Sequence, residues 1–112
     1  MSHPDLAPID TRFTALAGCA YPIIVAPMFM VSNEALVSEA SNTGGLGAAP
    51  SLNWRTPELF DAALTDIETR TSKPYAINLI VNKSNLRLAA DLAIVEKHKA
   101  DTTFGSNEAM FI

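Results

Sequence analysis

Four residues of this sequence could together hold a flat, conjugated ring. Ala26 ends a short apolar run and is followed by Pro27 and Met28, and Asn78 is the only polar residue between positions 76 and 81. Proline ends a strand because it has no backbone N–H to donate, and methionine offers a polarizable apolar surface. The amide of Asn78 can both donate and accept hydrogen bonds. Burying that amide unpaired would cost about 1–3 kcal/mol, so we expect it to meet a partner.

The partner of Asn78 has two candidates. A flavin edge, which alternates hydrogen-bond donors and acceptors, would suit the amide. Alternatively, Asn78 bonds the backbone of a neighbouring strand or a buried water molecule. The spacing of the residues leaves both readings open.

Neither histidine is a good catalytic candidate. His3 lies in a polar leader containing prolines, and such termini are usually poorly ordered. We expect His98 to close a helix on the outer layer, where a cation interacts favourably with the helix C-terminus.

Three continuous apolar runs, at residues 23–26, 46–49 and 76–81, predict the strands that position these residues. Their apolar residues are continuous and do not alternate with polar ones. This pattern is typical of strands buried on both faces, as in parallel sheets covered by helices.

The segments between and after these runs predict three helices. The first begins after Ser32 or Asn33 and stops at Gly44, and the second begins at the N-cap Thr56 with Pro57 in its first turn. The third begins near Ser84 or Asn85. The expected buried faces are Leu36, Val37 and Ala40; Leu59, Phe60, Ala63, Leu64 and Ile67; and Leu88, Ala89, Leu92, Ala93 and Val95.

The alternation of strand and helix predicts an α/β fold made of βα units. Open doubly wound sheets and closed (β/α)8 barrels both begin in this way. The sequence has no GxGxxG after its first strand and no P-loop motif, and the glycines at 44–47 are read as a helix stop with close packing. Because parallel α/β folds bind ligands beyond the carboxyl ends of their strands, Met28 and Asn78 are expected to meet there, on neighbouring strands.

Composition narrows the classes of partner. The chain has 112 residues, 12 acidic and 8 basic, with a net charge of -4, and its basic residues are scattered, so nucleic acid is not an expected partner. No apolar run reaches the roughly 18 residues of a membrane span. The single cysteine, Cys19, cannot form an internal disulfide, no Cys/His cluster suggests a metal site, and a reducing cytoplasm is the expected location.

Three motifs in order resemble the N-terminal portion of the nitronate monooxygenase family, formerly called 2-nitropropane dioxygenases. They lie at residues 21–28 (YPIIVAPM), 42–47 (NTGGLG) and 73–79 (KPYAINL). The resemblance begins at Arg12 and extends to about residue 99. The flavin-dependent enoyl-ACP reductases of bacteria share this opening and are the alternative.

The resemblance implies the first three βα units of an FMN-dependent (β/α)8 TIM barrel. Such enzymes oxidise alkyl nitronates with oxygen and release nitrite and a carbonyl compound. In the family, a strand-one APM segment lines the flavin and a strand-three asparagine reaches its ring system. These positions match Ala26, Pro27, Met28 and Asn78, and no catalytic residue is carried over to this segment.

Three regions are therefore expected: a flexible leader (1–11), the barrel portion (12–99) and an atypical polar tail (100–112). A fourth strand is due near residue 100, where the sequence is polar. Because a complete barrel needs roughly 250 residues, the chain is expected to be a fragment, inactive or nearly so alone. A non-catalytic reading also remains, an assembly module that associates through the open edges of its sheet.

Overall fold

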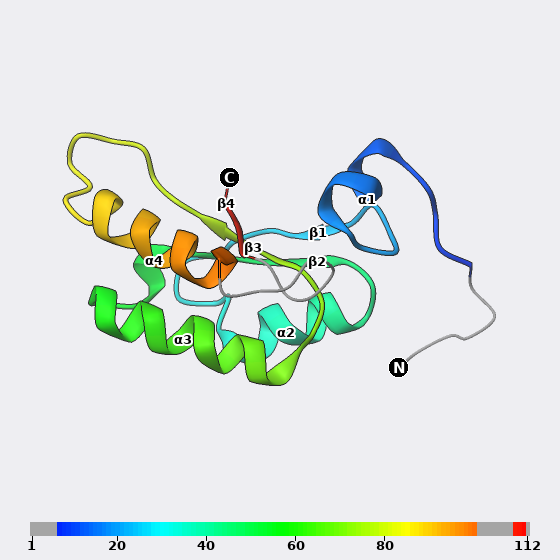
Figure 1. Cartoon of the computed structure of the whole chain (residues 1–112), viewed down its shortest axis with the longest axis horizontal. Helices are drawn as coiled ribbons and strands as arrows, with labels where there is room; N and C mark the ends of the chain where they lie inside the picture. The colour runs from blue at the N-terminus through cyan, green and yellow to red at the C-terminus, as the bar shows by residue number, and fades with distance from the viewer. Residues whose placement is uncertain (1–6, 101–108, 112) are drawn as a thin grey trace.

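The computed structural model describes residues 7–100 and 109–111, and the side chains of residues 7–98. Helices and strands alternate along the chain (Figure 1). The elements are α1 (Arg12–Ala17), β1 (Ile24–Val25), α2 (Glu34–Asn42), β2 (Leu46–Pro50), the 3-10 turn η1 (Ser51–Asn53), α3 (Pro57–Arg70), β3 (Tyr75–Asn78), α4 (Leu88–Ala100) and β4 (Ala109–Phe111). The predicted βα alternation is confirmed.

The strands form one parallel sheet in the order β1-β2-β3-β4. Val25 pairs with Gly47, Gly47 with Tyr75, and Pro50 with Asn78. Strand β4 pairs with β3, so the fourth strand lies at Ala109–Phe111 and not near residue 100, where it was expected. The polar residues between α4 and β4 lie outside the described residues, as does His3.

The two faces of the sheet are covered differently. Helices α2, α3 and α4 pack on one face, where Ala49, Tyr75 and Ile77 join the larger hydrophobic core. On the other face Leu46, Ala48 and Ala76 pack with Ala17 of α1. Figure 1 shows the three longer helices on one side of the sheet and α1 beside one end of the strands. This one-sided cover is what a barrel requires, because its second face becomes the interior.

Helix α1 was not predicted, and its ends explain why it forms. Thr11 and Thr14 make a reciprocal capping box: the Thr14 N–H donates to Thr11 Oγ1 at 3.1 Å, and the Thr11 N–H donates to Thr14 Oγ1 at 2.8 Å. The helix ends at Gly18, which is left-handed with φ 76°. Before α1, the Ile9 N–H donates to the Ala20 carbonyl, so the described part of the leader contacts the barrel portion.

The predicted N-caps of the next two helices are confirmed. The Asn33 side chain accepts from the Leu36 N–H, and the Thr56 side chain accepts from the Leu59 N–H, with Pro57 in the first turn. Each bond satisfies one of the amides that a first helical turn leaves free.

The glycine run acts as predicted, as a helix stop with close packing. Gly44 follows α2 with φ 107°, a backbone conformation that is strained for any residue with a side chain. A Cβ on Gly47 would lie 2.1 Å from the Val37 carbonyl oxygen, so only glycine lets α2 approach β2 this closely. The Gly47 N–H donates to Ser41 Oγ of the same helix at 3.1 Å.

Several predicted boundaries and faces are wrong. Strand β1 is only two residues long and β3 ends at Asn78, so Ile80 and Val81 lie beyond the sheet and are exposed. Helix α4 begins at Leu88 because residues 82–87 form turns, including Asn85 N–H to the Asn82 carbonyl. Leu59, Ala89 and Ala93 are exposed, while Asp91, on the same helix as Ala89 and Ala93, is fully buried.

Candidate functional site

The chain leaves the sheet after β1 in a tight turn, residues 26–32, which we call the β1 turn. The Met28 N–H donates to Ser32 Oγ at 2.8 Å, and Ser32 Oγ lies 3.4 Å from the Ala26 carbonyl oxygen. The N–H groups of Val31 and Ser32 both donate to the Met28 carbonyl. Ser32, with no exposed surface, therefore fixes the backbone on both sides of Pro27.

Asn78 is the last residue of β3 and is partly buried. Successive side chains of a strand alternate between faces. Tyr75 and Ile77 face the helices and Ala76 faces the other way, so Asn78 projects to the same face as Ala76, away from α3 and α4. This is the face that lines the interior of a barrel.

The structure brings the two predicted parts of the site to one edge, but on strands that are not neighbours. Strand β2 lies between β1 and β3, which corrects the expectation that Met28 and Asn78 are on adjacent strands. Counted from the paired residues Val25 and Gly47, Met28 and Pro50 are each three residues further on, and Pro50 pairs with Asn78. Two strand spacings of about 4.8 Å separate β1 from β3, so a ligand meeting both must be elongated.

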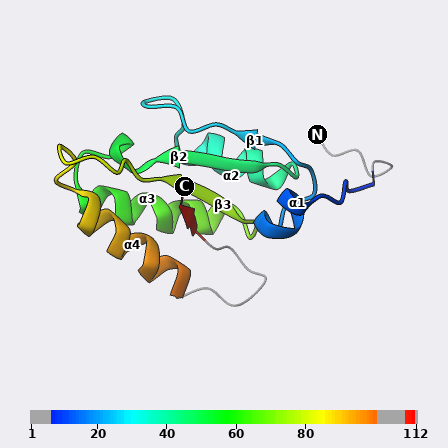
Figure 2. The same ribbon diagram turned by 90° about the horizontal axis from the view of Figure 1, so that it is seen from above.

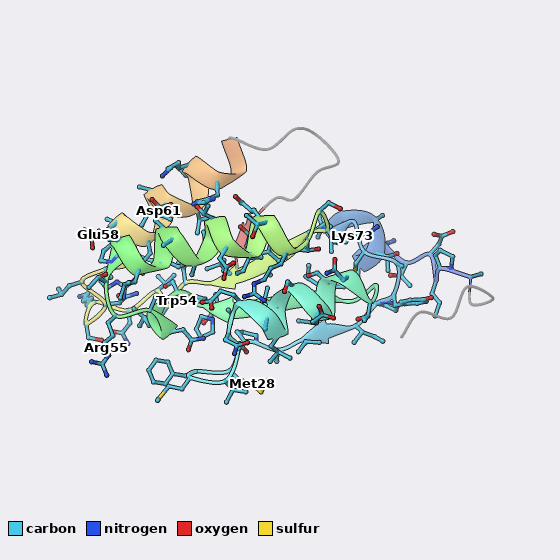
Figure 3. All side chains as sticks on the ribbon, turned by 90° about the horizontal axis from the view of Figure 1, so that it is seen from below. Met28, Trp54, Arg55, Glu58, Asp61 and Lys73 are labelled. Atoms are coloured by element: carbon cyan, nitrogen blue, oxygen red, sulfur yellow. The ribbon has the colours of Figure 1, made fainter. Side chains whose placement is uncertain are left out.

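Apolar side chains are exposed at this carboxyl edge. After β1, Met28 is 40% exposed and Met30 81% exposed, and Phe29 and Val31 are exposed as well. No residue from Tyr21 to Ser32 carries a charge. Figure 2 shows the loops that follow β1 and β3 at the end of the sheet opposite α1, and Figure 3 shows Met28 on the outside of its turn. An exposed apolar surface at the carboxyl edge of a parallel sheet lies where such folds bind ligands.

A third loop at the same edge was not identified from the sequence. Residues 51–54, after β2, contact the β1 turn through Asn53: its Oδ1 accepts from the Met30 N–H at 2.5 Å, and its Nδ2 donates to the Ser32 carbonyl at 2.7 Å. Trp54 Nε1 donates to Glu34 Oε1 of α2 at 2.6 Å. Nothing in the local sequence marks Asn53, because its partners lie more than twenty residues earlier in the chain.

Helix α4 holds this loop from the other side. Ser51 Oγ donates to Asp91 Oδ2 at 2.9 Å, and Arg87 pairs with Asp91 Oδ1 at 3.0 Å and donates to the Trp54 carbonyl. Arg87 Nε is the one buried side-chain nitrogen or oxygen without a hydrogen-bond partner in the described part of the chain. The signal in the sequence was the four-residue spacing of Arg87 and Asp91, which suits a helical ion pair.

His98 is far more buried than predicted, with 4% of its surface exposed. Its Nδ1 lies 2.9 Å from Glu68 Oε1, and its Nε2 lies 2.6 Å from Asp61 Oδ1, both on α3. It therefore joins α3 to α4 and is not an exposed cation at a helix end. Hydrogen bonds from Lys97 and then His98 lower the pKa of Asp61, and burial, followed by the charge of Glu68, raises the pKa of Tyr75.

This polar cluster belongs to the helix layer and not to the site. Figure 3 shows Asp61 on α3, on the side where α4 packs.

No group of three potential metal ligands occurs among residues 7–98, whose side chains are described. In the described part of the chain no helix is long and apolar enough to cross a membrane.

The fold and the edge define a class of protein, a parallel α/β chain with the opening units of a ligand-binding barrel. A solved structure of FabK from Thermotoga maritima superposes with a TM-score of 0.71 at 23% identity, covering 80% of this chain and 28% of that one. A FabK mutant from the same organism gives 0.70 at 18% identity, covering 92% and 39%. The fold is that of the first units of a (β/α)8 TIM barrel, as predicted.

The chain belongs to the nitronate monooxygenase family, whose model matches residues 10–110. The nitronate monooxygenase of Pseudomonas aeruginosa is 39% identical over 72 residues, which is 64% of this chain and 20% of the relative. A (3aS,4S,5R,7aS)-5-hydroxy-7a-methyl-1-oxo-octahydro-1H-indene-4-carboxyl-CoA dehydrogenase of Rhodococcus jostii is 32% identical over 91 residues, 81% of this chain and 26% of the relative. The chain thus spans about a quarter or less of the length of these relatives, and the family match includes most of the tail that the sequence analysis set apart.

Proposed function

We propose that this chain forms one wall of the cofactor site of an FMN-dependent oxidoreductase that oxidises alkyl nitronates with oxygen. The products are a carbonyl compound and nitrite. The observation that carries the proposal is the arrival of the segment 26–28 and Asn78 at the same carboxyl edge, in a chain of this family. Family resemblance implied these residues, and the proposal is supported by the rule that parallel α/β proteins bind ligands beyond the carboxyl ends of their strands.

The residues at this edge fit the ring of a flavin. A flavin ring is planar, with apolar faces and a polar edge, and the carboxyl edge of the sheet offers exposed Met28 after β1 and a partly buried amide, Asn78, on β3. On the interior-facing side of the sheet Ala48 and Ala76 are buried in the cluster with Ala17 of α1, so the ring would lie beyond them, at the carboxyl edge. The ring is also long enough to meet residues of strands that are not adjacent.

Each residue has a separate part in this proposal. Met28 packs against one face of the ring, and Pro27 keeps the backbone out of the strand ladder because it has no N–H to donate. Asn78 orients the polar edge of the ring through its amide. Bound FMN would supply the acceptor for the two electrons of the nitronate and their transfer to oxygen. We assign no acid or base to these residues.

A second candidate is a flavin-dependent reductase or dehydrogenase acting on an acyl thioester. The dehydrogenase relative is named for a CoA thioester and matches 81% of this chain. The exposed side chains Phe29, Met30 and Val31 would also suit an acyl chain. The two candidates share the proposed flavin wall and differ in the substrate.

The experiment is a pair of chimeras. Residues 10–110 of this chain replace the matching segment of the Pseudomonas aeruginosa nitronate monooxygenase in one, and of Thermotoga maritima FabK in the other. We expect the first chimera to purify yellow with FMN and to release nitrite from propyl nitronate, and the second to be poorly active. Asn78→Ala in the first chimera should weaken FMN binding by roughly tenfold, as expected for the loss of one hydrogen bond. The matched control is Asn42→Ala, on α2, whose side chain bonds Arg70 and Thr71 away from the carboxyl edge.

The outcomes separate the candidates. Activity only in the FabK chimera, reducing an enoyl thioester with NADH, would replace the first candidate by the second. Two chimeras that are folded by circular dichroism but hold no flavin would reject both. The isolated 112-residue chain should lose added FMN on desalting, because its described strands do not close a barrel. Stoichiometric FMN retained by that chain would contradict the view that most of the site lies in other segments.

A further inference from the structure

We propose that Asn53 is a positioning residue that locks the β1 turn into the shape that presents Met28 to the flavin. This inference rests on the proposed function and adds a residue that neither the sequence motifs nor the family resemblance indicated. The turn is held from outside, by a side chain of the loop after β2.

The side chain of Asn53 bonds the β1 turn at two points. Its Oδ1 accepts from the Met30 N–H, and its Nδ2 donates to the Ser32 carbonyl. Ser32 in turn accepts from the Met28 N–H through its hydroxyl. One amide group thus fixes the residues on both sides of Val31, and through Ser32 it reaches the backbone of Met28.

Met30 shows that the turn needs this support. It is the single non-glycine residue with positive φ in the described part of the chain, at 66°. Its side chain is 81% exposed, so packing of that side chain does not hold the backbone in this unfavourable region. The hydrogen bond from the Met30 N–H to Asn53 holds the backbone in this region. Without that bond the turn should relax to other shapes.

The anchor itself is rigid. Asn53 ends η1, which begins at Ser51, and Ser51 bonds the fully buried carboxylate of Asp91 on α4. Arg87 donates to the Trp54 carbonyl just after Asn53, and the Trp54 indole bonds Glu34 at the start of α2. Helices α2 and α4 therefore both fix the loop that holds the turn.

The bonds of Asn53 support an exposed surface and not the core. Phe29, Met30 and Val31 contribute nothing to the two hydrophobic clusters of the described residues. Exposing apolar residues on a strained turn brings no stability of its own. The arrangement has a use when a ligand packs against the turn, and Met28 is the residue of the turn at the proposed flavin site.

The first test measures the turn in this chain without flavin. Amide hydrogen exchange by NMR compares the unsubstituted chain with Asn53→Ala and with Asn53→Asp, which keeps an acceptor for the Met30 N–H. We expect Asn53→Ala to accelerate exchange of the Met30 amide by roughly tenfold and Asn53→Asp to change it much less. The matched control is Asn42→Ala, because Asn42 also makes two side-chain bonds, to Arg70 and Thr71, but at the other end of the sheet.

The second test measures the affinity and the absorbance spectrum of bound FMN. In the nitronate monooxygenase chimera, Asn53→Ala should weaken FMN binding about tenfold and shift the flavin absorbance bands, with partial rescue by Asn53→Asp. Unchanged Met30 exchange in a folded Asn53→Ala chain would overturn the inference. Faster exchange with unchanged FMN affinity and spectrum would also overturn it, since Asn53 would then be only structural. An unsubstituted chimera without FMN would instead reject the proposed function, while the exchange data would still decide whether Asn53 holds the turn.

Discussion

His98 lies between two carboxylates where α3 meets α4. Its Nδ1 faces Glu68 at 2.9 Å and its Nε2 faces Asp61 at 2.6 Å, so both bonds form together when the ring carries two protons. Lys97 adds a positive charge beside Asp61 at 2.8 Å. The Tyr75 hydroxyl donates to the other oxygen of Glu68 at 2.9 Å. A polar network therefore joins the two helices and β3.

Asp61 gives this network a dependence on pH. Hydrogen bonds from Lys97 and His98 lower the pKa of Asp61 below its ordinary value of 3.8. A carboxylate whose pKa is lower in the folded state stabilises the fold above its unfolded pKa, and this contribution is lost as the pH falls through the folded pKa. We expect Asp61→Asn to destabilise the chain by about 1 kcal/mol at pH 7, since the carboxylate is about one-third exposed and partly screened.

The measurement is urea unfolding of Asp61→Asn and the unsubstituted chain at neutral pH and below pH 3.8. The difference between their unfolding free energies should shrink at the acid end. The control is Asp66→Asn, whose carboxylate pairs with Arg70 in a more exposed position on the same helix. A difference that stays constant across this range would show that Asp61 is not held ionised by its partners.

At the scale of elements, local signals predicted the starts of α2 and α3, and only part of the buried faces. The cap residues Asn33 and Thr56 each accept from an amide three positions later, so the local sequence contains the whole interaction. The face that a helix buries depends on its neighbours. Leu59 is exposed although it fits the apolar stripe of α3. Asp91 is buried because it accepts hydrogen bonds from Ser51, in the loop after β2, and from Arg87, one helical turn earlier.

The contact between α2 and β2 depends on one missing side chain. A Cβ at position 47 would lie 2.1 Å from the Val37 carbonyl oxygen and 2.9 Å from the Val37 carbonyl carbon. These are backbone atoms of a helix, so the whole of α2 would have to move. We expect Gly47→Ala to lower the free energy of unfolding by about 3 kcal/mol, the upper range for overpacked cores.

Denaturant unfolding followed by circular dichroism would measure this loss. Gly45→Ala is the matched control, because its Cβ would lie 3.1 Å from the Ile23 carbonyl oxygen, a much milder contact. Its cost should be about 1 kcal/mol or less. Equal losses for the two substitutions would mean that the α2–β2 contact does not depend on Gly47 specifically.

For the molecule as a whole, the sequence predicts which edge carries the site but not how the edge is assembled. Parallel strands all end on the same side, so Met28 and Asn78 could be assigned to one edge from the order of the elements alone. The order of the strands in the sheet places β2 between them, and this requires the fold. Asn53 enters the edge for the same reason, since its loop follows that central strand.

The described sheet also has an open edge at β1, and this carries our last prediction. Strand β1 pairs only with β2 among the described strands, and Ile23 and Ile24 are 57% and 44% exposed. An apolar edge strand with unpaired N–H and C=O groups is a template for a second chain.

We propose that the isolated chain self-associates through β1, so its mass by light scattering should rise with concentration. Ile23→Lys should reduce that rise because it places a charge on the edge. Leu59→Lys, at a residue 52% exposed on α3, should leave it unchanged. A chain that stays monomeric at every concentration, or an equal effect of both lysines, would remove β1 as the interface.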